Sequence, residues 1–217
     1  DDFAAIVLAI HRGRQTFANL RQAMVYTLAV HVPIIGLALL PVLFGLPLVL
    51  APLHIAFLEL VIDPACSIVF EAEEGAADLM QQPPRAANEP LLSARHMLLS
   101  VLQGSVVTTA VVGLYAWLLG QPAHAATAST AAFVVLVAAN AALILPSRSS
   151  QTVWRSLWAG LTPVSLWVAG GTLAALAAIT TVPWLANAFR FVPLSPLHWF
   201  MALLAGLLLT VVFAANK

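Results

Sequence analysis

Two acidic side chains, Glu59 and Asp63, interrupt an otherwise apolar stretch, residues 51–70. They are the only two of the nine acidic residues that stand well inside an apolar segment. An ionisable side chain in hydrocarbon costs about 2.5 to 3.5 kcal/mol on insertion scales, so such residues are rare unless they act on something. Their i, i+4 spacing puts both carboxyls on one face of a helix. We expect this pair to bind a cation or metal ion.

The preceding apolar segment adds an imidazole at a similar depth. His31 lies seven residues after the expected start of its span near residue 24, and Asp63 lies seven residues before the end of the next span. At 1.5 Å per residue both would lie about 10 Å deep, and Glu59 about 6 Å further toward the midplane. Because the two spans would form an antiparallel hairpin, His31 and Asp63 could meet, with His31 as a third ligand or a proton-linked group.

Prolines in the same two segments should loosen the backbone. A proline removes one helical hydrogen bond, so Pro33 should free the Ala29 carbonyl and Pro64 the Leu60 carbonyl. Both carbonyl oxygens are candidate ligands, since carboxylates with free carbonyls suit a hard cation. An imidazole beside carboxylates also suits a transition metal such as manganese, or proton-linked transport. The residue types leave these alternatives open.

Less functional interpretations apply to the same residues. The two acids could form a structural clasp, bonded to His31 or to Ser and Thr side chains on neighbouring spans, and His31 alone is about as well explained by packing. His54 is nine residues before Asp63, which turns it to nearly the opposite face of a helix, so a packing role is favoured. Asn140 lies within an apolar segment, where hydrogen bonding between helices is favoured over a contribution to a cation path.

Composition limits the class of protein. The chain is 61% hydrophobic and 8% charged, against about 25% charged for an ordinary soluble domain. This indicates a multi-span helical membrane protein with the lipid bilayer as a partner. The net charge is zero and no basic, aromatic-interleaved patch stands out, so we expect no nucleic acid partner. A single cysteine, Cys66, excludes an internal disulfide, and its apolar neighbours suggest a small buried side chain.

Helical periodicity and length predict an all-α fold, a six-helix transmembrane bundle preceded by a cytoplasmic stalk helix. About 20 apolar residues cross a bilayer core. The stalk is residues 1–23, an amphipathic helix leading directly into the first span, and the transport domain is residues 24–217. The chain opens as if cut from a longer polypeptide. The predicted spans are about 24–45, 49–70, 96–119, 124–145, 156–181 and 195–215, separated by turn formers such as Gly45 and Pro47.

Positive charges predict the orientation. In the six-span arrangement eight of the nine basic residues fall on one side, and only Arg190 falls on the other. Such segregation is typical of the cytoplasmic side. We therefore expect both termini in the cytoplasm, with the protein in the plasma membrane. The eight residues are Arg12, Arg14, Arg21, Arg85, Arg95, Arg148, Arg155 and Lys217.

Four segments give the chain a family resemblance over nearly its whole length. The chain resembles the C-terminal membrane half of a P-type cation-transporting ATPase, in the branch of the calcium and sodium/potassium pumps. The opening resembles the end of that family's phosphorylation domain and the stalk of its fifth membrane helix, and FLELVIDPACSIVFEAE resembles its sixth, where the family typically reads Asn-Leu-x-Thr-Asp. Two further segments are similar to a cytoplasmic loop and to the link between the ninth and tenth helices, namely QQPPRAANEPLLS and VPWLANAFRFVPLSPLHWF.

The resemblance implies roles for individual residues. Asp63 corresponds to the family's sixth-helix aspartate ligand, and Glu59 to an asparagine ligand, so an acid is gained there. His31 and Ile34 stand where the preceding helix often carries Asn and Glu ligands, and Ile62 replaces a threonine. No acid in residues 131–145 matches the eighth-helix acid of the calcium pumps. The low number of side-chain oxygens argues against a calcium site of 6 to 8 oxygens.

The resemblance also implies what must lie elsewhere. The family's Asp-Lys-Thr-Gly, Thr-Gly-Glu and Gly-Asp-Gly-x-Asn-Asp motifs do not occur in this chain. We expect no catalysis by this chain alone and no cofactor within it. The partners would be the transported cation and a missing N-terminal half with the first membrane helices, actuator, phosphorylation and nucleotide domains, and the complete pump would use Mg-ATP. The alternatives are a standalone six-span channel or secondary carrier, and a non-transporting membrane subunit.

Overall fold

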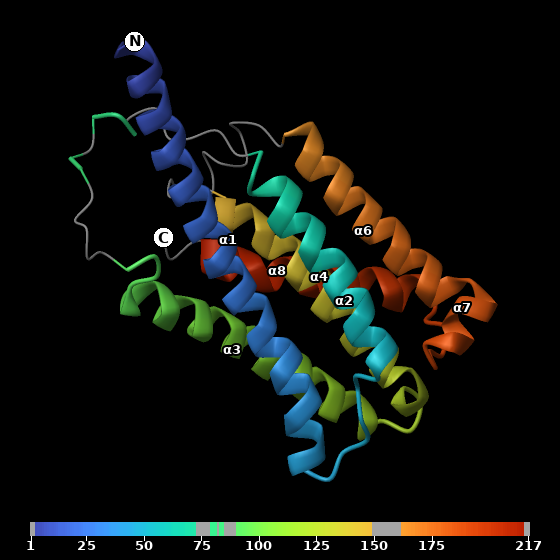
Figure 1. The fold of residues 1–217 in the computed structure, drawn as a ribbon. Coiled ribbons are helices and arrows are strands. Elements are labelled where there is room, and N and C mark those ends of the chain that lie inside the picture. Colours follow the sequence, from blue (N-terminus) through green and yellow to red (C-terminus); the bar gives the residue numbers. More distant parts are fainter. Residues whose placement is uncertain (1–2, 73–78, 82, 85–89, 149–161, 215–217) are drawn as a thin grey trace.

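A computed structural model describes residues 3–72, 79–81, 83–84, 90–148 and 162–214. Within these ranges all regular structure is helical, which confirms the all-α prediction (Figure 1). Cys66 belongs to a helical turn, but its side chain lies outside the description, as do Arg85, Arg155 and Lys217. In chain order the helices are α1 Phe3–Leu43, α2 Pro52–Pro64, the π-helix η1 Ala65–Val69, α3 Ala94–Leu119, the 3₁₀ turn η2 Ala125–Thr127, α4 Ala128–Arg148, α6 Pro163–Thr181, α7 Pro183–Ala188 and α8 Pro196–Ala214.

Five helical stretches in the described residues are long and apolar enough to cross a membrane. They are Phe3–Leu43, Pro52–Val69, Ala94–Leu119, Ala125–Ile144 and Pro163–Thr181, and a shorter apolar stretch, Pro196–Leu209, lies in α8. Large apolar side chains stay exposed along these helices, for example Leu39 on α1, Leu102 on α3 and Leu208 on α8. Such surfaces suit lipid contact, so the prediction of a multi-span membrane protein is confirmed.

α1 is a single helix of 41 residues that covers both the predicted stalk and the first predicted span. Its N-terminal part is held by the connection that follows η1. Arg14 donates to the Leu79 carbonyl at 2.8 Å, and Arg21 donates to the Leu91 carbonyl at 3.0 Å. Pro33 and Pro41 both lie inside α1 without ending it. The helix therefore links this connection directly to the region of His31.

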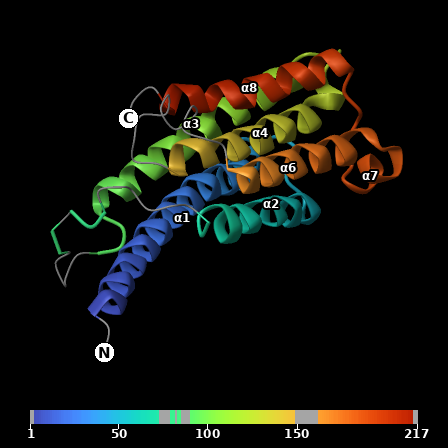
Figure 2. The same cartoon turned by 90° about the horizontal axis from the view of Figure 1, so that it is seen from above.

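α4 forms the centre of the bundle, with α8 on one side and α6 toward the other (Figures 1 and 2). Most of its residues are buried, and its closest packing is with α8. Gly206 permits this approach, because a Cβ there would lie 2.5 Å from the Val135 carbonyl oxygen. Thr130 fixes the following connection, since its hydroxyl donates to the Val192 carbonyl at 3.0 Å and accepts from the Val192 N–H.

α1 and α3 form the second close helix pair. Gly104 makes the approach possible, because a Cβ there would lie 2.6 Å from the Ala29 carbonyl oxygen and 2.5 Å from the Val32 Cβ. Small residues commonly bring membrane helices together in this way. At the other end of α3 the Tyr115 hydroxyl donates to the Pro47 carbonyl at 2.9 Å. This bond fixes the α1–α2 connection, where Gly45 has a positive φ of 68° that suits glycine.

The end of α4 and the presence of α7 both differ from the sequence prediction. α4 was expected to end at residue 145 before a turn, but it continues through Pro146 to Arg148. A proline in the last turn leaves only one carbonyl without its helical donor, so the helix need not stop there. The short helix α7 was not predicted. Its signal is Pro183, which favours extended backbone at Val182 (ψ 119°) and starts a new helix at its first position.

Candidate cation site

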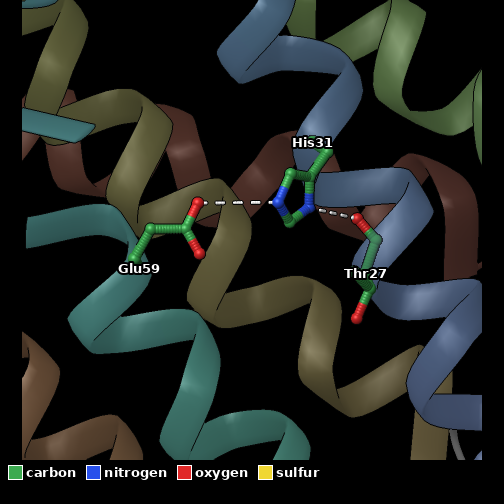
Figure 3. A network of polar contacts seen from close by, with 3 residues as sticks. All are labelled: Thr27, His31 and Glu59. Carbon is green, nitrogen blue, oxygen red and sulfur yellow. Dashed lines mark hydrogen bonds and ion pairs between the residues drawn. The ribbon is translucent and has the colours of Figure 1, made fainter. Parts of the chain in front are cut away.

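The structure brings together His31 of α1 and Glu59 of α2 (Figure 3). The His31 Nε2 atom lies 3.5 Å from the Glu59 Oε1 atom. Both side chains are only partly covered by this chain, with 36% and 42% of their surfaces exposed. The pair therefore lies between two helices while remaining open to another ligand or protein segment.

A second hydrogen bond fixes the chemistry of the imidazole. His31 Nδ1 lies 2.7 Å from the Thr27 carbonyl oxygen, one turn earlier on α1. A carbonyl oxygen can only accept, so Nδ1 carries a proton and donates it. Nε2 then presents a lone pair toward the carboxylate unless it is protonated too. Two electron-rich atoms facing each other across 3.5 Å need a proton or a cation between them.

Asp63 does not join this pair. Its side chain is exposed and, among the described residues, has neither a hydrogen bond nor an ion pair. Its backbone carbonyl accepts a 2.7 Å hydrogen bond from the Ser67 hydroxyl. The depth estimate had placed His31 level with Asp63, whereas the structure pairs it with Glu59. That estimate assumed that both helices enter the membrane at known residues, and a continuous helix of 41 residues offers no such marker.

The two candidate carbonyls have different surroundings. The Ala29 carbonyl oxygen lies against Gly104 of α3, as the tight approach at that glycine requires. The Leu60 carbonyl belongs to an exposed residue of α2, and Pro64 has no N–H to offer it. Just after Pro64 the chain changes to the π-helix η1, in which the Phe70 N–H donates to the Ala65 carbonyl. Such π turns are frequent at functional sites in helices. Both carbonyls stay predictions as ligands.

His54 lies on a different face of α2, as its spacing from Asp63 predicted. It is buried, and its ring packs against three phenylalanines with ring centroids 4.8 to 5.6 Å apart, namely Phe133, Phe189 and Phe191. Its Nδ1 accepts a 2.8 Å hydrogen bond from the Ala51 N–H, which caps the start of α2. These contacts give His54 a structural role at the end of the helix.

Asn140 has surroundings that the sequence did not predict. Its side chain is fully buried in α4, yet among the described residues neither its amide oxygen nor its amide nitrogen has a hydrogen-bond partner. The expected bond from this side chain to another helix is therefore not found. The neighbouring contact is a backbone one, because the Tyr26 hydroxyl donates to the Asn140 carbonyl at 3.3 Å. Buried amides normally find a partner, so this unsatisfied amide is an exception to the usual packing of membrane helices.

The described residues contain no group of three or more His, Cys, Asp or Glu side chains placed to hold a metal ion. The pair of His31 and Glu59 supplies one nitrogen and one carboxylate, fewer ligands than Ca²⁺ or Mg²⁺ normally takes. Further ligands would have to come from water, from rearranged neighbours such as Asp63, or from other segments. His31 and Glu59 therefore supply only part of the ligand set that such an ion needs.

Comparison with known families supplies the wider context. Residues 47–217 match the family model described as "Cation transporting ATPase, C-terminus". This match covers most of the chain, including α2 with Glu59 and Asp63. It begins after the segment that carries His31, so the histidine lies outside the matched region.

Curated relatives extend the similarity to α1. The chain is 27% identical over 219 residues to the probable cation-transporting ATPase F of Mycobacterium bovis, covering 100% of this chain and 24% of that protein. It is 30% identical over 226 residues to the calcium-transporting ATPase of Bacillus subtilis, covering 97% of this chain and 25% of that protein. A sodium/potassium-transporting ATPase subunit alpha-B from Artemia franciscana is 35% identical over 111 residues, which is 48% of this chain and 11% of that protein.

Nearly all of this chain matches the first two of these cation pumps, and it spans about a quarter of their length. The family model that covers it describes the C-terminal membrane part of such pumps, and the described helices have the length and apolarity that this part requires. The family resemblance expected from the stretch around Glu59 and Asp63 is confirmed. The chain belongs to the P-type cation-transporting ATPases, as their C-terminal membrane domain.

Proposed function

We propose that the chain is the cation-translocation domain of an ATP-driven pump, in which the transported cation binds at Glu59 with His31 and Asp63 as further ligands. The observation that supports it most directly is the facing pair of His31 Nε2 and Glu59 Oε1 atoms, 3.5 Å apart. A carboxylate that faces an imidazole lone pair attracts a positive charge, whether a proton or a metal ion. Asp63, one helical turn from Glu59, could rotate toward the same ion.

Other features support the same proposal. Glu59 and His31 are partly uncovered by this chain, as expected if the missing membrane helices complete the site. Asn140, whose buried amide has no hydrogen-bond partner among the described residues, is in this proposal a peripheral contributor to the cation path. The relatives are named as calcium-transporting, sodium/potassium-transporting and probable cation-transporting ATPases. Carboxylate and imidazole ligands suit a divalent metal that accepts nitrogen, or a cation whose transport is linked to protons.

α1 is the element best suited to couple the site to ATP hydrolysis. One unbroken helix carries Arg14 and Arg21, which bind the α2–α3 connection, and also Thr27 and His31. A displacement at its N-terminal end would therefore reach the imidazole without crossing a loop. In this proposal residues 1–23 are the stalk, and an N-terminal half of the pump supplies Mg-ATP hydrolysis through its phosphorylation, nucleotide and actuator domains.

The proposed topology has six spans, with α8 as the sixth, and both termini on the cytoplasmic side of the plasma membrane. Among the described residues, Arg12, Arg14 and Arg21 lie in the first half of α1, and Arg95 lies at the start of α3. Arg190, at the opposite end of the bundle, follows α7 (Figure 2). This distribution agrees with a cytoplasmic position for the N-terminal end of α1.

The experiment is cation-dependent ATPase activity and ion transport by the full-length protein, reconstituted in vesicles, with Asp63→Asn and Glu59→Gln variants. Each variant should raise the cation concentration needed for half-maximal activity by at least tenfold, since one carboxylate ligand is lost. Unchanged cation dependence in both variants would refute the ligand assignment. Ion flux that needs no ATP would instead support the channel or carrier alternative.

A further inference from the structure

A second pair of histidines meets at the other end of the bundle. His124 lies in the connection between α3 and α4, and His198 lies in the first turn of α8. Their ring centroids are 5.2 Å apart, with an angle of 74° between the ring planes. The α3–α4 connection and the start of α8 lie at the same end of the bundle as α7, far from the N-terminal end of α1 (Figure 2). The two rings thus join segments that are 74 positions apart in sequence, counting from 124 to 198.

The ring nitrogens of this pair are accessible. His198 is exposed and His124 is partly exposed. Only one of their four ring nitrogens is engaged within the described residues, because His198 Nδ1 lies 2.8 Å from the Ser195 hydroxyl oxygen. A hydroxyl can donate or accept, so the Ser195 hydroxyl can accept a hydrogen bond from the protonated Nδ1, which leaves the Nε2 lone pair of His198 free. Histidines that bind metals commonly hold their second nitrogen in such a bond.

The ring separation fits a shared metal ion. A zinc–nitrogen bond is about 2.05 Å, and the centre of an imidazole lies about 1.15 Å beyond its nitrogen, so metal and centroid are about 3.2 Å apart. At a tetrahedral angle two such rings have centroids about 5.2 Å apart. The observed separation has this value. His124 has no hydrogen bond to its ring in the described residues, so the ring is free to turn a nitrogen toward the ion.

We propose that His124 and His198 form a surface site for a borderline divalent transition metal ion such as Zn²⁺ or Cu²⁺. Each histidine supplies one nitrogen, and water completes the coordination, because no third His, Cys, Asp or Glu joins them in the described part of the chain. Imidazole favours zinc and copper over calcium or magnesium. Bound metal ties the α3–α4 connection to the start of α8. The site is separate from the candidate cation site and does not depend on the proposed function.

The chain contains a matched control for this site. Ser93 and His96 at the start of α3 repeat the arrangement of Ser195 and His198 at the start of α8. In both, the serine hydroxyl lies 2.8 Å from the histidine Nδ1. Of His96 and His198, only His198 has another histidine ring against it among the described residues. A His96→Gln change therefore removes the same local hydrogen bond without touching the proposed metal ligands.

The test is Zn²⁺ binding by calorimetry and Cu²⁺ paramagnetic resonance on the purified full-length protein. A background with His31→Gln, Glu59→Gln and Asp63→Asn removes the three proposed side-chain ligands of the candidate cation site. We expect one Zn²⁺ to bind with a dissociation constant on the order of 1–100 μM, about tenfold or more weakened by His124→Gln and by His198→Gln and unchanged by His96→Gln. The Cu²⁺ spectrum should show two coordinating nitrogens, and one after either change.

Two results would overturn the proposal. The first is Zn²⁺ affinity that is the same in the His124→Gln, His198→Gln and parent proteins. The second is a Cu²⁺ spectrum whose nitrogen couplings are unaffected by either substitution. Thermal unfolding of each variant without metal checks that the fold is retained. We expect both substitutions to preserve the fold, since His198 is exposed and His124 is partly exposed.

Discussion

His31 Nδ1 is bound to the Thr27 carbonyl, and this bond aims His31 Nε2 at the Glu59 carboxylate, 3.5 Å away. The imidazole is therefore oriented by its own helix, while its free nitrogen faces a second helix. A carboxylate that faces an imidazole nitrogen attracts positive charge, which is why we propose that a cation binds here. The affinity for a cation bound as proposed would therefore depend on both His31 and Glu59.

Coupling between His31 and Glu59 gives the first prediction. His31→Gln should weaken cation activation of the full-length pump by about tenfold, because one ligand or proton acceptor is lost. The double variant with Glu59→Gln should be weakened by less than the product of the two single effects, since residues that act on one ion are not independent. Titration of ATPase activity against the cation measures this. Strictly multiplicative effects would show that the two side chains do not share an ion.

Asn140 gives a second prediction, in which stability and function change in opposite directions. Replacing its buried, unpaired amide by Asn140→Leu should stabilise the cation-free protein by about 1–3 kcal/mol, since a desolvated polar group no longer lacks partners. The same change should weaken cation activation if the amide oxygen helps to bind the ion. Thermal unfolding and activation curves test the two effects separately. A variant that is more stable with unchanged cation activation would leave Asn140 out of the site.

Helix packing at Gly104 gives a third prediction. Gly104→Ala should destabilise the protein by about 1–3 kcal/mol, because its Cβ would lie 2.6 Å from the Ala29 carbonyl oxygen. Gly113→Ala on the same helix is the control, since nothing lies within 4 Å of its Cβ, and it should be neutral or stabilising. Thermal unfolding in detergent compares them. Equal stability of the two variants would mean that α1 and α3 do not approach closely at Gly104.

His54 gives a fourth prediction, directed at structure and not at the ion. His54→Ala should cost about 2–4 kcal/mol of stability, because the ring fills space between Phe133 and Phe191 and accepts from the Ala51 N–H. The cation concentration for half-maximal activity should not change in the variant that remains folded. A selective loss of cation affinity with normal stability would contradict the structural role assigned to this histidine.

The sequence predicted the helices well where a single physical cause dominates. Apolar length and turn formers predicted a span at 96–119, and the structure has α3 at Ala94–Leu119. Gly45 was predicted to lie in the turn between the first two spans, and it adopts a positive φ there. The helical face also separated His54 from Asp63, and in the structure His54 is buried against Phe133 while Asp63 is exposed. Hydrophobic periodicity and backbone preferences depend on residues near each other in the sequence, so a single sequence is enough to predict these helices and turns.

What the sequence could not predict depends on how helices meet. Which acid faces His31 depends on the relative shift of α1 and α2, and hydropathy does not determine that shift to within one turn. The π-helix after Pro64 arises from a hydrogen-bond rearrangement that no residue type specifies uniquely. The Asn140 side chain was expected to bond across helices, but whether a neighbouring helix offers it a partner atom depends on how the bundle packs, and among the described residues none does.

Direct cation binding to the full-length protein, with and without Glu59→Gln, tests the central claim most closely. Equilibrium binding of the activating cation in the absence of ATP should detect a site in the parent protein and at least tenfold weaker binding in the variant, at unchanged thermal stability. Binding of equal affinity in both proteins would contradict the account, because Glu59 would then hold no transported ion.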